Sequence, residues 1–119
     1  LGLTEYEEKT FTLTLSTPER AILECLFLAP ERMDLVECYQ VMEGLANLRP
    51  KLLQELLEAC QSVKVTRLFM YMASKAKHPW FKYLKPESLA LGKGDRSLTK
   101  GGVYVAEYQI SIPRELAEL

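Results

Sequence analysis

Apolar residues recur every three or four positions in the first part of this chain, which is the spacing of helices that bury one face. The first such stretch begins at Ser16-Thr17-Pro18-Glu19. We predict that Ser16 caps this helix and that Glu19, three residues later, completes a capping box. Pro18 suits the first helical turn, and Pro30 ends the pattern. The predicted inner positions are Ala21, Ile22, Cys25, Leu26 and Leu28.

Three further helices are predicted from the same spacing. The second begins at Asp34 and ends near Gly44, with inner positions Leu35, Cys38, Tyr39 and Met42. The third has Pro50 in its first turn, with a wide apolar face made of Leu52, Leu53, Leu56, Leu57 and Cys60. The fourth covers 65–76, with Leu68, Phe69, Met72 and Ala76 facing inward.

The pattern changes beyond Pro79. An aromatic segment over 80–84 predicts one or two helical turns. The stretches 88–91, 97–100 and 104–112 are predicted to be strands, separated by glycine-containing turns at 92–95 and 101–102. An earlier strand is predicted over 11–15, where apolar and polar residues alternate.

The predicted fold class is therefore α+β: an N-terminal strand, four to five helices, and a small C-terminal antiparallel sheet. A length of 119 residues fits one domain. We expect that domain to span 11–119 and the polar, acidic residues 1–10 to form a linker or the tail of a preceding domain. Because the chain begins at Leu1 rather than Met, we expect it to be a piece of a longer protein.

The net charge of −1 conceals a segregation of charge along the chain. Residues 49–100 contain eleven Lys and Arg against four Asp and Glu, whereas residues 1–48 contain three against nine. A basic region within a folded domain is a candidate contact for an acidic protein surface or for nucleic acid. No apolar run approaches the ~18 residues of a membrane span, and no secretory signal opens the chain, so we expect no membrane association.

The residues that usually carry catalysis do not form a plausible array. His78 is the only histidine, has basic neighbours and precedes Pro79, so we predict a capping or surface role for it. Cys25, Cys38 and Cys60 lack metal-ligand spacing, which favours buried, reduced thiols in a cytoplasmic protein. The loop at 92–96 lacks phosphate-loop spacing and a following helix, so a hairpin turn is the better interpretation. We predict no enzyme activity and no cofactor.

Eight basic residues are the candidate contacts with nucleic acid or a partner. Aromatic residues accompany them at Tyr71, Trp80, Phe81 and Tyr83, and aromatic rings beside positive charge can stack on bases. The alternative is that the large aromatic residues fill the core and the lysines form a solvated face. The candidates are Lys64, Arg67, Lys75, Lys77, Lys82, Lys93, Arg96 and Lys100.

Several segments resemble the AbiEi family of antitoxins. They are LSTPERAILE (15–24), MEGL and LRP within 42–50, LLQELL (52–57), SVKVTRLF (62–69) and YQISIP (108–113). The resemblance covers about residues 11 to 116, and its order and spacing are more specific than any single motif. It implies helix starts at Ser16 to Arg20 and at Arg49-Pro50, and it makes Lys64 and Arg67 the leading contact candidates. It offers no catalytic residues.

The resemblance implies the antitoxin of a bacterial type IV toxin–antitoxin system linked to abortive phage infection. The partner would be a nucleotidyltransferase-like toxin, which need not form a stable complex with the antitoxin. Family members typically place a promoter-binding winged helix N-terminal to the region that this chain resembles, so autorepression would need that segment as well. The alternative is a protein-interaction or oligomerisation module of a transcriptional regulator.

Overall fold

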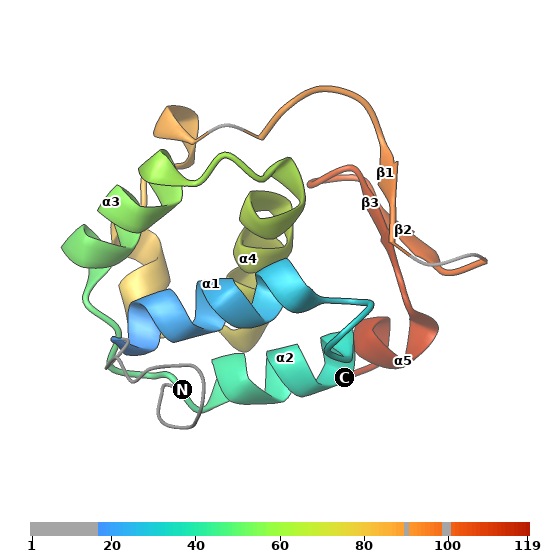
Figure 1. The fold of residues 1–119 in the computed structure, drawn as a ribbon, viewed down its shortest axis with the longest axis horizontal. Helices are drawn as coiled ribbons and strands as arrows, with labels where there is room; N and C mark the ends of the chain where they lie inside the picture. The colour runs from blue at the N-terminus through green and yellow to red at the C-terminus, as the bar shows by residue number, and fades with distance from the viewer. Residues whose placement is uncertain (1–16, 90, 99–100) are drawn as a thin grey trace.

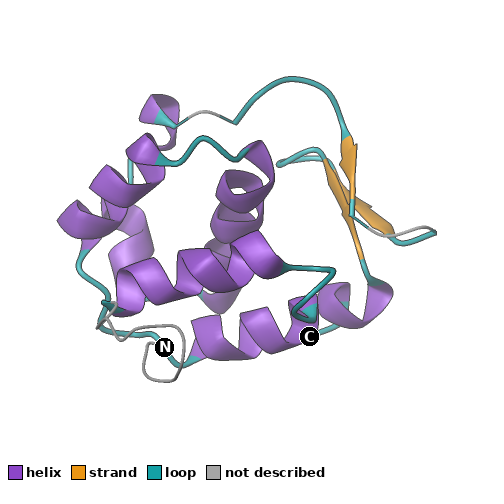
Figure 2. Cartoon of the chain, viewed as in Figure 1, coloured by secondary structure: helices purple, strands orange, loops and turns teal. Residues whose placement is uncertain are grey.

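Helices form most of the structure, and a small sheet closes its C-terminal end (Figures 1 and 2). The computed structural model of the chain describes residues 17–89, 91–98 and 101–119. The helices are α1 (Pro18–Leu28), α2 (Leu35–Glu43), α3 (Pro50–Ala59), α4 (Val63–Ala76) and α5 (Arg114–Ala117). Two 3₁₀ turns, η1 (Pro79–Tyr83) and η2 (Pro86–Ser88), follow α4. The strands are β1 (Arg96–Ser97), β2 (Val103–Val105) and β3 (Ile110–Ile112).

Helix α4 is the centre of the core. Its residues Val65, Leu68, Phe69 and Met72 are at most 1% exposed, and Ser62 caps its first turn by accepting a hydrogen bond from the Val65 amide. Helices α1 and α2 pack against it, and α3 packs against α1 (Figure 1). The sheet and α5 complete the core from the other end, because Ile110, Ile112 and Leu116 are fully buried.

The four predicted long helices are confirmed, with two differences in the first. Thr17 rather than Ser16 is the N-cap residue, and its hydroxyl accepts a hydrogen bond from the Arg20 amide at 3.2 Å. Glu19 therefore occupies the second helical position and makes no capping box. Leu28, predicted to face inward, is 39% exposed, whereas the predicted inner residues of α2 are all buried.

The aromatic segment forms a short turn that anchors α4 to α2. Trp80 in η1 is 3% exposed, and its ring lies 5.9 Å from that of Phe69. Its indole Nε1 donates a hydrogen bond to the Leu45 carbonyl at 2.8 Å. The predicted one or two helical turns are thus confirmed, and Trp80 and Phe69 belong to the core.

The C-terminal sheet has three strands in the order β1-β3-β2, and its pairing is mixed. β2 pairs with β3 in antiparallel fashion, but β1 pairs with β3 in parallel, so the predicted all-antiparallel sheet is corrected to a mixed one. The single strand predicted over 104–112 is wrong: residues 106–109 make a turn in which Gln109 adopts a left-handed φ of 54°. The strand predicted at 88–91 is also wrong, because Ser88 ends η2 and Leu89 caps it.

Two other differences concern the ends of the chain. Helix α5 was not predicted, because its four residues are too few to show a helical period. The predicted strand over 11–15 and the linker over 1–10 lie outside the described residues.

Candidate partner-binding surfaces

Arg67 is not a surface residue. It is 2% exposed, and its Nε donates to the Leu91 carbonyl at 2.7 Å while Nη1 donates to the Gln109 carbonyl at 3.1 Å. Gly92 approaches closely here: a Cβ on Gly92 would lie 3.1 Å from both methyl groups of Val63 and 3.5 Å from the Arg67 guanidinium. The guanidinium therefore joins α4 to the sheet, which corrects its predicted role as a leading contact.

Lys64 is also held within the fold. Its Nζ donates to the Phe27 carbonyl at 3.0 Å and to the Ala29 carbonyl, at the C-terminal end of α1. A cation at a helix C-terminus satisfies carbonyls that lack a helical partner and interacts favourably with the helix dipole. Nζ also lies 5.8 Å from the centre of the Phe27 ring. Lys64 therefore stabilises the end of α1, and its ammonium group is not free to reorient toward a ligand.

The two lysines at the end of α4 differ in their surroundings. The Nζ of Lys75 donates to the Ala117 carbonyl at 3.3 Å and lies 5.8 Å from the centre of the Tyr39 ring, so Lys75 links α4 to α5 and α2. Lys77 is exposed and caps α4 in a left-handed conformation with φ of 59°.

The remaining described candidates are exposed but do not form one patch. Lys82 lies on η1, whereas Lys93 precedes β1 and Arg96 begins it. In Figure 1, η1 (yellow) and β1 (orange) lie on opposite sides of α4. The structure therefore brings Lys93 and Arg96 to the same end of the molecule and separates them from Lys82. Lys100 lies outside the described residues.

The loop before β1 is held against β2 by a tyrosine. The Tyr104 hydroxyl donates to Asp95 Oδ1 at 2.7 Å, and the tyrosine remains 49% exposed. This hydrogen bond, together with some burial, raises the pKa of Tyr104. An exposed aromatic residue of the sheet is thus hydrogen-bonded to the 93–96 segment, and aromatic rings together with basic residues can bind nucleic acid.

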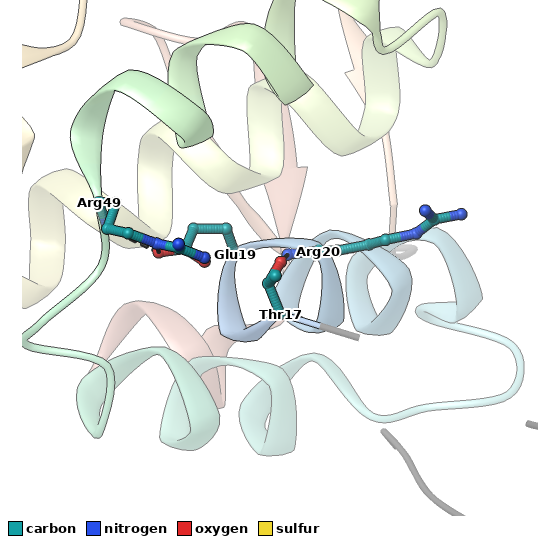
Figure 3. Close-up of polar contacts among 4 residues, drawn as sticks. All are labelled: Thr17, Glu19, Arg20 and Arg49. Carbon is teal, nitrogen blue, oxygen red and sulfur yellow. Dashed lines mark hydrogen bonds and ion pairs between the residues drawn. The ribbon is translucent and has the colours of Figure 1, made fainter. Parts of the chain in front are cut away.

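A buried carboxylate joins α1 to α3 (Figure 3). Glu19 Oε2 accepts hydrogen bonds from the Arg49 amide at 2.7 Å and from Arg49 Nε at 3.3 Å, and Oε1 lies 3.1 Å from Arg49 Nη2. Burial alone would raise the pKa of Glu19, but the hydrogen bonds and charge of Arg49 outweigh it and hold that pKa below its usual value. Sequence reasoning missed this pair because its members are 30 residues apart.

A hydrophobic groove runs along the exposed side of α1. It has a volume of about 640 Å³ and is open to solvent. Its apolar lining comes from Leu23, Phe27 and Leu28 on α1, Leu56 and Ala59 on α3, Cys60, and Val65 on α4, with Arg20 and Glu24 beside them. The sequence carried a signal for this groove: every residue from 21 to 28 except Glu24 is apolar, which is more than one buried face requires.

A second groove, of similar volume and here called the polar groove, is lined mainly by polar and charged residues. It lies between α3 and the 3₁₀ turns, where Lys51, Glu55, Glu58 and Lys85 contribute both signs of charge. Tyr83, 61% exposed, lies at its edge. This mixture matches no single class of ligand.

His78 and the three cysteines, for which no catalytic role was predicted, are at least partly buried in the fold. His78 occupies the N-cap position of η1 without a capping side-chain hydrogen bond, so its predicted place at a helix boundary is confirmed. Its side chain is half-buried, and Nε2 lies 2.7 Å from the Met42 carbonyl oxygen. Cys38 is buried, while Cys25 and Cys60 are half-buried; all three are free thiols. Within the described ranges, no three His, Cys, Asp or Glu side chains are grouped as a metal site requires. No helix in those ranges combines the length and apolarity needed to cross a bilayer.

The described residues form a small α+β domain, and comparison with known families identifies its kind. A family described as "Transcriptional regulator, AbiEi antitoxin, Type IV TA system" matches residues 1–113. The chain therefore belongs to the AbiEi antitoxin family of type IV toxin–antitoxin systems. Comparison with curated proteins and with solved structures gives no match.

Proposed function

We propose that this chain neutralises a nucleotidyltransferase-like toxin without catalysis and supports transcriptional autorepression, acting in the bacterial cytoplasm. The observation that carries this proposal is the family match, which extends over residues 1–113 of 119. The buried or capping roles of His78, Cys38 and Glu19 agree with a binding function, because none of these side chains is presented to a substrate.

The contact surface that we propose is the end of the sheet that carries Lys93 and Arg96. Both side chains are exposed, and Tyr104 of the same small sheet, hydrogen-bonded to Asp95 between them in the sequence, offers a half-exposed aromatic ring. Lys64, Arg67 and Lys75 are less suitable, because their charged groups already bind backbone carbonyls. In a type IV system the antitoxin can act on the target that the toxin modifies, so this surface would meet the same nucleic acid.

Growth rescue tests the function directly. The chain is co-expressed with the toxin gene adjacent to its own, and colony growth is scored. Rescue of growth is the expected result. A folded, soluble chain that fails to rescue growth overturns the proposal that this region is sufficient as the antitoxin.

Charge reversal tests the contact surface separately. The variant Lys93→Glu/Arg96→Glu should lose rescue, whereas Arg32→Glu/Lys51→Glu, which changes net charge equally at exposed positions outside the candidate set, should retain it. Circular dichroism confirms that both variants are folded. Rescue by the first variant at the wild-type level would remove Lys93 and Arg96 from the proposed surface while leaving the antitoxin function in place.

Nucleic-acid affinity supplies a measurement without the toxin. Contacts with phosphates release counterions, so the logarithm of the binding constant should fall linearly with the logarithm of salt concentration. Fluorescence anisotropy with labelled single-stranded RNA should give a slope whose magnitude decreases by about 1.4 in Lys93→Glu/Arg96→Glu, about 0.7 for each lost contact with a single-strand phosphate. An unchanged slope would contradict direct phosphate binding by these two side chains.

A further inference from the structure

Helix α1 carries two apolar stripes, and only one is fully buried inside the domain. Ile22, Leu26 and Ala29 are fully buried against the other helices. Leu23, Phe27 and Leu28 form the second stripe, in which Phe27 is 66% exposed and Leu28 is 39% exposed. An exposed apolar patch that is hollowed and flanked by polar residues is typical of a protein–protein contact.

Phe27 is the most exposed large apolar residue of the described chain. Lys64 binds the Phe27 carbonyl at 3.0 Å, and its ammonium lies 5.8 Å from the ring centre. An aromatic side chain has only two rotatable bonds, so it loses little conformational entropy when a partner covers it. Large aromatic residues that become buried in a pocket supply much of the energy of protein interfaces.

The charges beside the groove favour a partner with the same surface. Arg20 and Glu24 lie 3.3 Å apart on the exposed side of α1, with side chains 66% and 53% exposed. This pair has no net charge, so it does not select a strongly acidic or strongly basic partner, whereas a second copy offers each charge its opposite. The net charge of the whole chain, −1, also leaves little repulsion between copies.

We infer that two copies of this chain associate through the α1 groove, related by a two-fold axis, with Phe27 of each copy buried against the other. A two-fold arrangement needs one self-complementary surface and is the commonest symmetry of soluble oligomers. This inference concerns assembly and does not depend on the proposed antitoxin activity.

The size of the groove indicates a weak dimer. A standard interface buries about 800 Å² on each partner and uses about 20–30 residues a side. That area is roughly an eighth of the 6784 Å² surface of this chain. The groove has nine lining residues, so the contact is smaller than standard unless neighbouring residues join it. We therefore expect dissociation in the range of about 1–100 μM rather than a permanent dimer.

Sedimentation velocity tests this inference. Across protein concentrations from about 1 μM to about 500 μM, the wild-type mass should rise from 13.6 kDa toward twice that value. Phe27→Ser should remain at 13.6 kDa throughout, because it removes the central apolar contact. Tyr83→Ser is the matched control: Tyr83 is 61% exposed, close to the 66% of Phe27, but lies at the polar groove. It should associate as the wild type does.

Two results would overturn the inference. The first is a wild-type chain that stays monomeric over the whole range; loss of growth rescue in Phe27→Ser would then assign the groove to a different partner. The second is a folded Phe27→Ser variant that associates as strongly as the wild type, which would place self-association elsewhere. Because Phe27 is mostly exposed, its replacement leaves the core intact, and circular dichroism verifies this.

Discussion

At the scale of single residues, the buried carboxylate of Glu19 shows how a residue in the first turn of one helix can stabilise its contact with another helix. An acidic residue in the first turn of a helix would ordinarily bind that helix's own amides. Here Thr17 takes the capping role, and Glu19 also binds the amide and guanidinium of Arg49 (Figure 3). The carboxylate thereby fixes the start of α3 against the start of α1.

We expect Glu19→Ala to reduce the free energy of unfolding by about 1–3 kcal/mol, because it leaves hydrogen-bond donors of Arg49 without their partner and removes a buried side chain. Arg20→Ala is the control: Arg20 belongs to an exposed pair with Glu24, for which about 0.3–0.5 kcal/mol is usual. Urea denaturation at pH 7 measures both. Equal losses in the two variants would contradict a special role for Glu19.

The same carboxylate should make stability depend on acidity. The pKa of Glu19 is lowered in the folded chain from an ordinary value of 4.5, so the folded state favours the charged form. Its stabilising contribution is complete above pH 4.5 and is lost as the pH falls through the lower, folded pKa. The difference in unfolding free energy between wild type and Glu19→Gln should therefore shrink in acid, as urea denaturation between about pH 3 and 6 can establish. A constant difference across that range would contradict this assignment.

A substitution at Lys77 is expected to increase, rather than decrease, the stability of the chain. It ends α4 with φ of 59°, a left-handed conformation that costs a residue with a Cβ about 1 kcal/mol or more and costs glycine little. We expect Lys77→Gly to raise the free energy of unfolding by up to about 1 kcal/mol. Thermal denaturation measures the change, with Lys77→Ala as the control that removes the charge but keeps the strain. Equal stability of the two variants would show that the conformation is not strained.

At the scale of secondary-structure elements, the sequence predicted the helices well and the sheet only in part. Each long helix shows its period over at least two turns, and proline or a capping residue defines its start. The turn at 106–109 contains neither glycine nor proline, so β2 and β3 were predicted as one strand. The parallel pairing of β1 with β3 depends on contacts between residues 14 apart, which local alternation does not encode.

Arg67 connects two of these elements, and its loss should affect them together. We expect Arg67→Ala to destabilise the chain by about 3–5 kcal/mol, because it removes two charge-assisted hydrogen bonds from the interior. The Leu91 carbonyl would lose its bond from Arg67, and the Gln109 carbonyl would keep only its bond from the Arg96 amide. Arg67→Lys should recover only part, since a single ammonium does not reproduce the two-pronged guanidinium. Arg96→Ala, at an exposed arginine of the same sheet, should change stability by less than about 0.5 kcal/mol.

Urea denaturation measures these three variants, and hydrogen exchange at the Ile110 and Ile112 amides reports on the sheet. Faster exchange there in Arg67→Lys, with α2 protected as in the wild type, would show that the arginine holds the sheet in place. Unchanged exchange would contradict that connection.

At the scale of the whole molecule, the segregation of charge along the sequence does not become a segregation in space. The basic residues described between positions 49 and 98 lie on or beside α3, α4, η1 and β1, which occupy different parts of the fold (Figure 1). Residue counts show the excess of positive charge but not where each basic side chain lies in the fold. They also cannot identify the basic residues whose charged groups bind carbonyls inside the molecule. Lys64, Arg67 and Lys75 are such residues.

The reactivity of the cysteine thiols reports whether α1 and α2 are packed against each other. Burial, reinforced by the neighbouring Cys25 and by Asp34, raises the pKa of Cys38 to about 12. At pH 8 its thiolate would then be about one part in ten thousand. We expect iodoacetamide to modify the half-buried Cys60 in the native chain and Cys38 only on unfolding, as peptide mass spectrometry in the presence and absence of urea would show. Rapid native labelling of Cys38 would contradict a closed contact between α1 and α2.

The position of Arg67 also limits how this chain can be divided. A shortened chain ending before Leu91 would retain a guanidinium in the interior while losing both carbonyls that it binds, and it would uncover the side of α4 that Ile110, Ile112 and Leu116 now cover. Helices α1 to α4 therefore do not form an independent folding unit, because the sheet and α5 complete their core. Deletion mapping of antitoxin activity should keep residues 17–117 together, because a loss of activity on trimming the sheet would report misfolding rather than the removal of a binding surface.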